Sequence, residues 1–259
     1  MGVTAKPKDG RMNCGMNRKK DVDAILSAVI QQYSIVRQDY ERALRDGSLD
    51  LRVPVKNLME NLRSALDYMA HDIYESCCHS TRLLIGKSVP NNIYFPYGKT
   101  ESDFKARVGS SLPGLATNSP DIYKMMLSIQ PFSCGDAWLY DLCIILNENK
   151  HNRLKVQKRT ESETYSVESE HGSVAIPINN PNIKITSLPG AVKVFGISAD
   201  FREDGIHTTS SDTRKHKRTK WIAFTFEGTN VNVINLLDKS TTGIKNFAEG
   251  LFQKIGCNG

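Results

Sequence analysis

The spacing of apolar residues changes near residue 155, and this change limits the folds open to the chain. From Asp21 to Gly47, apolar residues recur at alternating intervals of four and three, which places them on one face of a packed helix. A second stripe of this kind covers residues 54–74. After residue 155, apolar residues come in short β-branched runs separated by Asn, Pro and Gly. The sequence predicts an α+β protein with an N-terminal helical bundle, an antiparallel β-rich half and a C-terminal helix.

Two more helices are predicted in the first half. Ser119-Pro120 followed by Asp121 is typical of a helix start, and Pro131 closes that helix. Residues 134–154 are apolar almost all round, so we expect this helix to be the most buried element. Residues 86–118 hold several glycines and prolines, which predicts an irregular excursion.

The second half is read as a linker or mobile loop, several strands and a final helix. The polar stretch 157–172 is the linker, and residues 236–255 form the helix. The predicted strands cover residues 174–178, 182–186, 191–198 and 221–226. No connection has room for a crossover helix, so we expect antiparallel pairing.

Three regions are predicted, and the charge is divided unevenly among them. Residues 1–18 are read as a disordered basic arm, residues 19–156 as the bundle, and residues 157–259 as the β-rich region with the C-terminal helix, packed on the bundle. The net charge of +6 consists of +5 in residues 1–20, −2 up to residue 154 and +3 beyond it. A basic nucleic-acid groove across the helical half is therefore not expected.

Cysteine spacing and hydropathy predict a cytoplasmic protein without a membrane span. The six cysteines lack the spacing of a disulfide framework, and no apolar run approaches the roughly 18 residues of a span. Cys77-Cys78-His79 has no second cysteine pair at zinc-site spacing, so no metal is expected. No common nucleotide-binding signature is present, and no cofactor is expected.

Arg63, Asp67 and His71 follow one another at intervals of four on the helix predicted at residues 54–74. An Asp one turn from a His can orient the imidazole, and a nearby Arg can hold an anion such as a phosphate. The alternative is a ladder of intrahelical ion pairs at the edge of the core.

A second polar cluster, Asn149, His151 and Arg153, ends the helix predicted at residues 134–154. Asn149 and Arg153 continue the line of Leu142 and point inward, which favours a structural polar network. The alternative is a catalytic or ligand-binding pocket that includes Asn149 and His151.

The strongest charge run is Arg214, Lys215, Lys217 and Arg218, with Lys220 nearby. Such a run is usually a solvated hairpin loop. The alternative is contact with the phosphates of RNA or DNA, or with an acidic protein partner.

Two stretches resemble a widespread set of uncharacterised bacterial proteins. They are NLRSALDYMAH at residues 61–71, and IQPF at residues 129–132 leading into LNENKHNRL at residues 146–154. The set reads RNALDHLA in the first place and LQPY, then NxDKHRxL, in the second, before a β-rich tail. The resemblance implies kinship and brings no activity with it.

A looser resemblance links the chain to the HEPN superfamily of helical bundles, many of which cut RNA. Their signature is an Arg followed four to six residues later by His, with a polar residue after the Arg. Here seven residues separate Arg63 from His71, which departs from that pattern, and Ser64 is the polar residue. The resemblance implies a metal-independent RNase in which His71 or His151 is the general acid/base and Arg63 holds the phosphate.

Our leading prediction from the sequence is a non-catalytic binding or scaffold protein, and the metal-independent RNase is the alternative.

Overall fold

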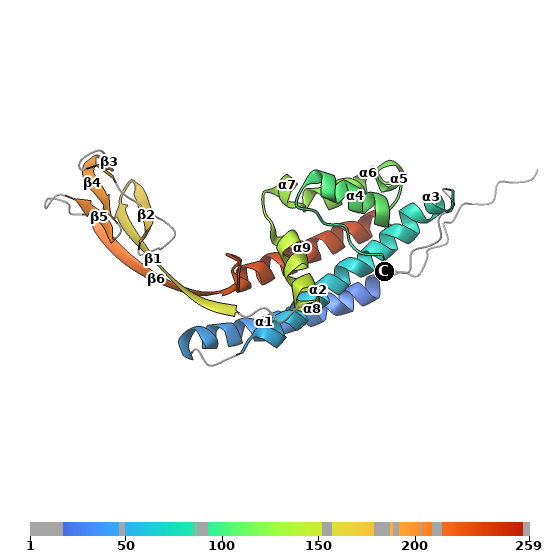
Figure 1. Ribbon diagram of the computed structural model, residues 1–259, viewed down its shortest axis with the longest axis horizontal. Helices are drawn as coiled ribbons and strands as arrows, with labels where there is room; N and C mark the ends of the chain where they lie inside the picture. Colours follow the sequence, from blue (N-terminus) through green and yellow to red (C-terminus); the bar gives the residue numbers. More distant parts are fainter. Residues whose placement is uncertain are drawn as a thin grey trace, which may run out of the picture. The chain divides into compact units, whose positions relative to one another are not determined.

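The computed structural model describes residues 18–46, 50–84, 86, 93–151, 157–178, 187–188, 192–202, 204–208 and 214–255. For Asp46, Arg82, Asn149, Lys150, His151 and Trp221, the description covers the backbone alone. The predicted α+β class is confirmed, with helices first, antiparallel strands in the middle and a C-terminal helix (Figure 1).

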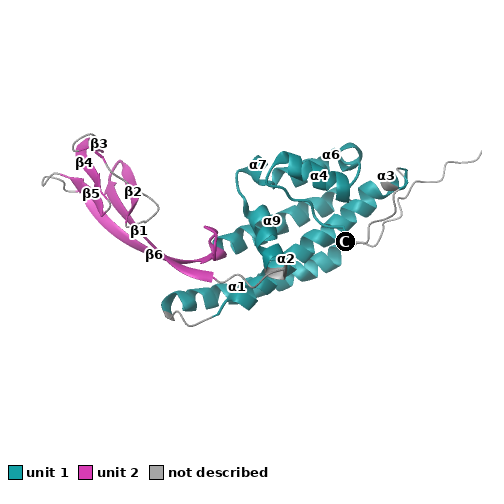
Figure 2. Cartoon of the chain, in the orientation of Figure 1, with its two compact units in different colours: residues 1–156, 234–259 teal, residues 157–233 magenta. Residues whose placement is uncertain are grey.

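The chain divides into two compact units (Figure 2). The first combines residues 1–156 with 234–259, and the second consists of residues 157–233. The C-terminal helix was placed with the β-rich region in the sequence analysis, whereas in the structure it belongs to the helical unit. The strands are thus an insertion between two parts of one helical unit.

The helical unit contains nine α-helices among its described residues, and a π-helical turn extends one of them. Their bounds are α1 (Lys19–Asp46), α2 (Arg52–Ile73), α3 (His79–Leu84), α4 (Glu101–Ser111), α5 (Leu115–Asn118), α6 (Pro120–Ser128), α7 (Pro131–Cys134), α8 (Trp138–His151) and α9 (Val233–Lys254), with the π-helix η1 at Tyr74–Cys78. Residues 86–118 are therefore not irregular throughout, because α4 and α5 lie within them. Thr100 explains the start of α4, since its hydroxyl accepts from the Asp103 N–H while the Asp103 carboxylate accepts from the Thr100 N–H.

The core of the helical unit is built around α2. Six of its large apolar side chains are fully buried, namely Leu58, Met59, Leu62, Leu66, Met69 and Ile73. The helix packs against both α1 and α8, and Leu142 of α8 is also fully buried. Helices α2 and α8 therefore share one core.

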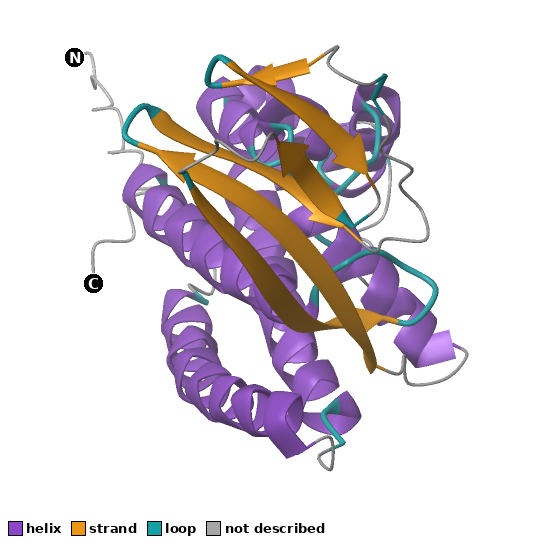
Figure 3. Cartoon of the chain, turned by 90° about the vertical axis from the view of Figure 1, so that its left-hand side faces the viewer, coloured by secondary structure: helices purple, strands orange, loops and turns teal. Residues whose placement is uncertain are grey.

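The inserted unit contains two three-stranded antiparallel sheets (Figure 3). One has the order β2-β1-β6 and the other β3-β4-β5. The strand bounds are β1 (Gln157–Ser169), β2 (Gly172–Ile178), β3 (Val192–Val194), β4 (Ile197–Arg202), β5 (Gly205–Thr208) and β6 (Lys215–Phe226). Val167, Val194, Ala199 and Ile206 form a small shared core. The predicted antiparallel pairing is confirmed.

Two sequence predictions fail in this unit. Residues 157–172 were read as a linker, but β1 is the central strand of its sheet and pairs with both β2 and β6. The basic run was read as a loop, but it begins β6. A long strand can keep one face in water, so a polar composition does not prevent a stretch from forming a strand. In both stretches, pairing with neighbouring strands decides the structure. The strand predicted at residues 182–186 lies outside the described residues.

Candidate functional site

A pocket of about 530 Å³ in the helical unit brings together α2, α4, α8 and the segment 93–98. The residues that line it are Arg63, Asp67, Tyr94, Phe95, Pro96, Tyr97, Arg107, Ser111 and Asn147. Arg63 and Asp67 were predicted from the sequence. The lining residues that were not predicted include Tyr94, Tyr97, Arg107 and Asn147. The aromatic cluster at residues 94–97 is the sequence feature that could have pointed to the two tyrosines.

Arg63 and Asp67 form an ion pair on α2 that also binds the backbone of Phe95. The Arg63 Nη2 atom lies 3.1 Å from Asp67 Oδ1, and Nε donates to Oδ2 at 3.2 Å. The Phe95 N–H donates to Asp67 Oδ1 at 2.8 Å, and Arg63 Nη2 donates to the Phe95 carbonyl at 3.4 Å. The pair therefore fixes the segment 93–98 to α2, and one rung of the predicted ion-pair ladder is present.

Gln130 fixes the same segment from the other side. Its side chain is fully buried, and its Oε1 accepts from the Gly98 N–H at 3.1 Å. Its Nε2 donates to the carbonyls of Met126 at 3.0 Å and Pro96 at 3.5 Å. A fully buried amide with these partners is structural, and it explains the glutamine of the IQPF stretch.

Tyr97 lies at the centre of the pocket's polar groups. The guanidinium of Arg107 lies 4.3 Å from the centroid of the Tyr97 ring, and that of Arg63 lies 5.2 Å from it. Asn147 Nδ2 donates to the Tyr97 hydroxyl at 2.9 Å. Only 5% of Tyr97 is exposed, so the ring is a fixed platform against which both cations rest.

Cys143 of α8 is a buried hydrogen-bond partner of Arg63. Its buried Sγ accepts from Arg63 Nη1 at 2.8 Å, and burial raises the pKa of this thiol. Burial lowers the pKa of Arg63, but the facing Cys143 and Asp67 outweigh this effect and the net direction is upward. Arg63 is therefore a permanent cation with its acceptors already in place.

The two arginines differ in what they have left to bind. Arg63 is 12% exposed and is matched by Asp67. Arg107 is exposed and has no ion pair or hydrogen bond with any residue that the structure describes; its contact is with the Tyr97 ring. A contact with a ring does not give the guanidinium an acceptor oxygen. The pocket therefore holds one cation in excess, at Arg107.

Of the other residues in the predicted catalytic set, the structure describes the side chain of His71 alone. His71 lies on α2 but is not among the lining residues. The side chains of Asn149 and His151, and the whole of Arg153, lie outside the described residues, so the predicted network at the end of α8 stays a prediction. Asp67 is bound to Arg63 and to the Phe95 N–H.

The basic run does not form one surface, because β6 sends alternate side chains to opposite faces. Arg218 donates to the Asp204 carbonyl at 2.9 Å, and Lys220 lies 3.6 Å from Glu161. Arg214 donates to the Val194 carbonyl. Lys215 and Lys217 alternate with these residues, on the other face of the strand. Most of the run is thus used within its own unit.

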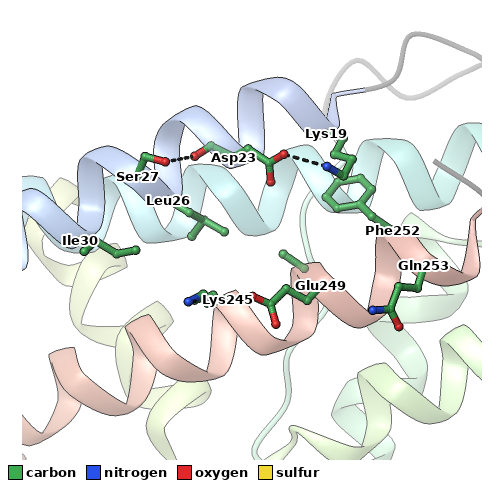
Figure 4. A pocket seen from close by; sticks show the side chains of 10 residues that line it. Lys19, Asp23, Leu26, Ser27, Ile30, Lys245, Glu249, Phe252 and Gln253 are labelled. Carbon is green, nitrogen blue, oxygen red and sulfur yellow. Dashed lines mark hydrogen bonds and ion pairs between the residues drawn. The ribbon is translucent and has the colours of Figure 1, made fainter. Parts of the chain in front are cut away.

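A second cavity of similar size lies between α1 and α9, as Figure 4 shows. Leu26 and Phe252 supply apolar surface to it. Its charged residues form pairs on their own helices: Lys19 with Asp23 at 3.0 Å, and Lys245 with Glu249 at 4.0 Å. With equal numbers of cations and anions, this groove has no preference for a charged ligand.

The part of the chain that the structure describes contains neither a metal site nor a membrane-spanning helix. No group of three or more His, Cys, Asp or Glu side chains there could hold a metal ion. No helix there is both long enough and apolar enough to cross a membrane. Comparisons with known protein families, curated proteins and solved structures found no match.

Proposed function

We propose that this is a non-catalytic binding protein whose pocket between α2, α4 and α8 takes an anionic ligand. The observation that supports this proposal is the difference between the two arginines. Asp67 neutralises Arg63, whereas Arg107 has no carboxylate partner among the described residues and lines the same pocket. Hydrogen bonds from a guanidinium to a carboxylate or phosphate are about twice as strong as those between neutral groups.

The described lining of the pocket has no unpaired carboxylate and no histidine, and this favours binding without catalysis. Asp67 is the one carboxylate among its described lining residues, and Arg63 and the Phe95 N–H already hold it. A metal-independent RNase, the alternative, needs a histidine as general acid/base, and no histidine is among the described lining residues.

Incubation of RNA with the wild type, Arg63→Ala and His151→Ala should give no degradation in any sample. Cleavage that depends on either residue would restore the RNase reading.

The expected RNA or acidic protein partner of the basic run has little support as a separate proposal. The exposed cations that remain on the other face of β6 are Lys215 and Lys217, and Lys215 lies 3.9 Å from Glu168. A footprint of several phosphate contacts needs more cations than this.

Calorimetric titration with pyrophosphate tests the anion proposal. Saturable binding is expected for the wild type. Arg107→Gln should weaken it by about tenfold or more, because a hydrogen bond to a charged group contributes about 1.5 to 3 kcal/mol.

Lys105→Gln is the matched control for this titration. It removes one positive charge from the same helix, but Lys105 is 58% exposed, pairs with Glu101 at 2.7 Å and does not line the pocket. Its affinity should stay at the wild-type value. Equal losses for both variants would mean that pyrophosphate responds to overall charge, and an absence of saturable binding to the wild type would refute the proposal.

A further inference from the structure

Tyr94 is an exposed aromatic residue on a segment that is otherwise buried. Its exposed fraction is 56%, while Ile93, Phe95 and Tyr97 are each exposed by 5% or less. Among the described residues, it has no ring partner and no hydrogen bond. It nevertheless lines the same pocket as Arg107. The pocket therefore offers an aromatic face that the protein itself leaves uncovered.

The backbone beneath Tyr94 is held in place before any ligand arrives. Asp67 and Arg63 bind the N–H and the carbonyl of Phe95, the next residue. Phe95 also packs edge-on against Phe247 of α9, with the ring centroids 5.2 Å apart. Because its neighbour is fixed in this way, little backbone entropy is lost when a ring stacks on Tyr94.

Two further described lining residues, Asn147 and Ser111, are polar and neutral. Asn147 uses its Nδ2 on the Tyr97 hydroxyl and keeps its Oδ1 as an acceptor, and Ser111 brings a hydroxyl from the end of α4. The pocket thus combines a cation, an uncovered aromatic face and neutral hydrogen-bonding groups. Its volume of about 530 Å³ falls in the usual range for small-molecule sites.

We infer that the anion taken by this pocket is the phosphate of a nucleotide, with the phosphate on Arg107 and the base stacked on Tyr94. The inference rests on the proposed anion-binding function and adds the stacking of a base on the Tyr94 ring. A base stacks on an aromatic side chain whatever its sequence identity, while an arginine binds the phosphate. The ligand is a free mononucleotide or an unpaired nucleotide of an RNA strand, since both present the same chemistry.

Calorimetric titration of the full-length protein with ribose 5-phosphate, AMP and UMP tests whether a base stacks on Tyr94. Both nucleotides should bind the wild type at least about fivefold more tightly than ribose 5-phosphate, the lower end of what stacking contributes. Tyr94→Ala should abolish this margin and leave the affinity for ribose 5-phosphate unchanged.

Tyr68→Ala is the matched control, because Tyr68 is 40% exposed on α2 and does not line the pocket. It should bind all three ligands like the wild type. A five-nucleotide RNA that binds more tightly than AMP indicates a strand as the source, and equal affinity indicates a free nucleotide.

The inference and the proposed function fail in different ways. Equal affinities of AMP, UMP and ribose 5-phosphate for the wild type, or a margin that survives Tyr94→Ala, would overturn the nucleotide inference while anion binding stands. If pyrophosphate, ribose 5-phosphate and the nucleotides all fail to bind, both are wrong.

Discussion

At the scale of single residues, Gly243 of α9 lies against the ring of Trp138 of α8. A Cβ at this position would lie 2.6 Å from Trp138 Cζ2. Ala normally stabilises a helix interior over Gly by about 0.5 to 1 kcal/mol, but overpacking of a core costs about 1 to 3 kcal/mol. We therefore expect Gly243→Ala to lower the melting temperature.

Gly109→Ala is the control for this prediction, because a Cβ there would have no neighbour within 4 Å. This change in α4 should raise the melting temperature. If both variants are stabilised alike in thermal melts, the close approach of α8 and α9 is incorrect.

Asp141 and Asp136 should give pH dependences of opposite sign. Burial, and then the charge of Asp136, raises the pKa of Asp141, whereas Lys239 at 2.6 Å lowers the pKa of Asp136. A raised pKa means that Asp141 contributes stability below its unfolded pKa of about 3.9 and loses that contribution as the pH rises through its folded value. A lowered pKa means that Asp136 contributes stability above that unfolded pKa and loses the contribution as the pH falls through its folded value.

Denaturant unfolding of two variants between pH 3 and pH 7 checks these signs. Relative to the wild type, Asp141→Asn should be more stable at pH 7, and Asp136→Asn should be less stable. Both differences should shrink towards pH 3. Differences of the same sign for the two variants at pH 7 would contradict these environments.

At the scale of elements, the long helices were predictable and the polar strand was not. The stripes on α1 and α2 could be read from spacing because a helix buries one face whatever its partner is. In β1, the polar residues at 160, 162, 164 and 166 suggested a linker. Whether such a segment forms a strand depends on its partners, and β6 lies more than 40 residues further along the chain.

In the candidate site, the two residues of α2 were predictable from the sequence, whereas Arg107 and Tyr94 were not. Arg63 and Asp67 share a face of α2, so their proximity followed from helical geometry alone. Arg107 was missed because α4 buries few apolar side chains, chiefly Phe104 and Val108, and such a helix has a weak sequence pattern. The role of Tyr94 depends on Gln130 and Asp67, which are distant in sequence, and no local rule connects them.

Hydrogen exchange tests the corrected assignment of β1. Residues 163–168 of β1 pair on both sides, with β2 and with β6. Their amides should therefore exchange far more slowly than those of a linker. Exchange of this stretch at the rate of an unstructured peptide would show that the linker prediction was correct.

At the scale of the whole molecule, the strands form an insertion whose two ends are neighbours. Gln157 pairs with Phe226 at the start of β1 and the end of β6, and Arg159 pairs with Phe224. Replacing residues 160–223 by a short Gly/Ser linker should therefore leave the helical unit folded. Every described residue that lines the pocket belongs to that unit.

Two measurements check this prediction. The shortened protein should unfold in one cooperative transition, and it should bind pyrophosphate with the wild-type affinity. Aggregation or a non-cooperative melt would show that the helical unit depends on the strands for its stability.

The central claim is that an anion binds at Arg107, and its Nε–H resonance in a ¹⁵N NMR titration tests this most directly. Arg52 is the internal reference, since its Nε donates to Asp50 at 2.9 Å and it does not line the pocket. With pyrophosphate, the Arg107 resonance should shift and saturate while that of Arg52 stays in place. A saturating shift at other arginines without one at Arg107 would contradict the claim.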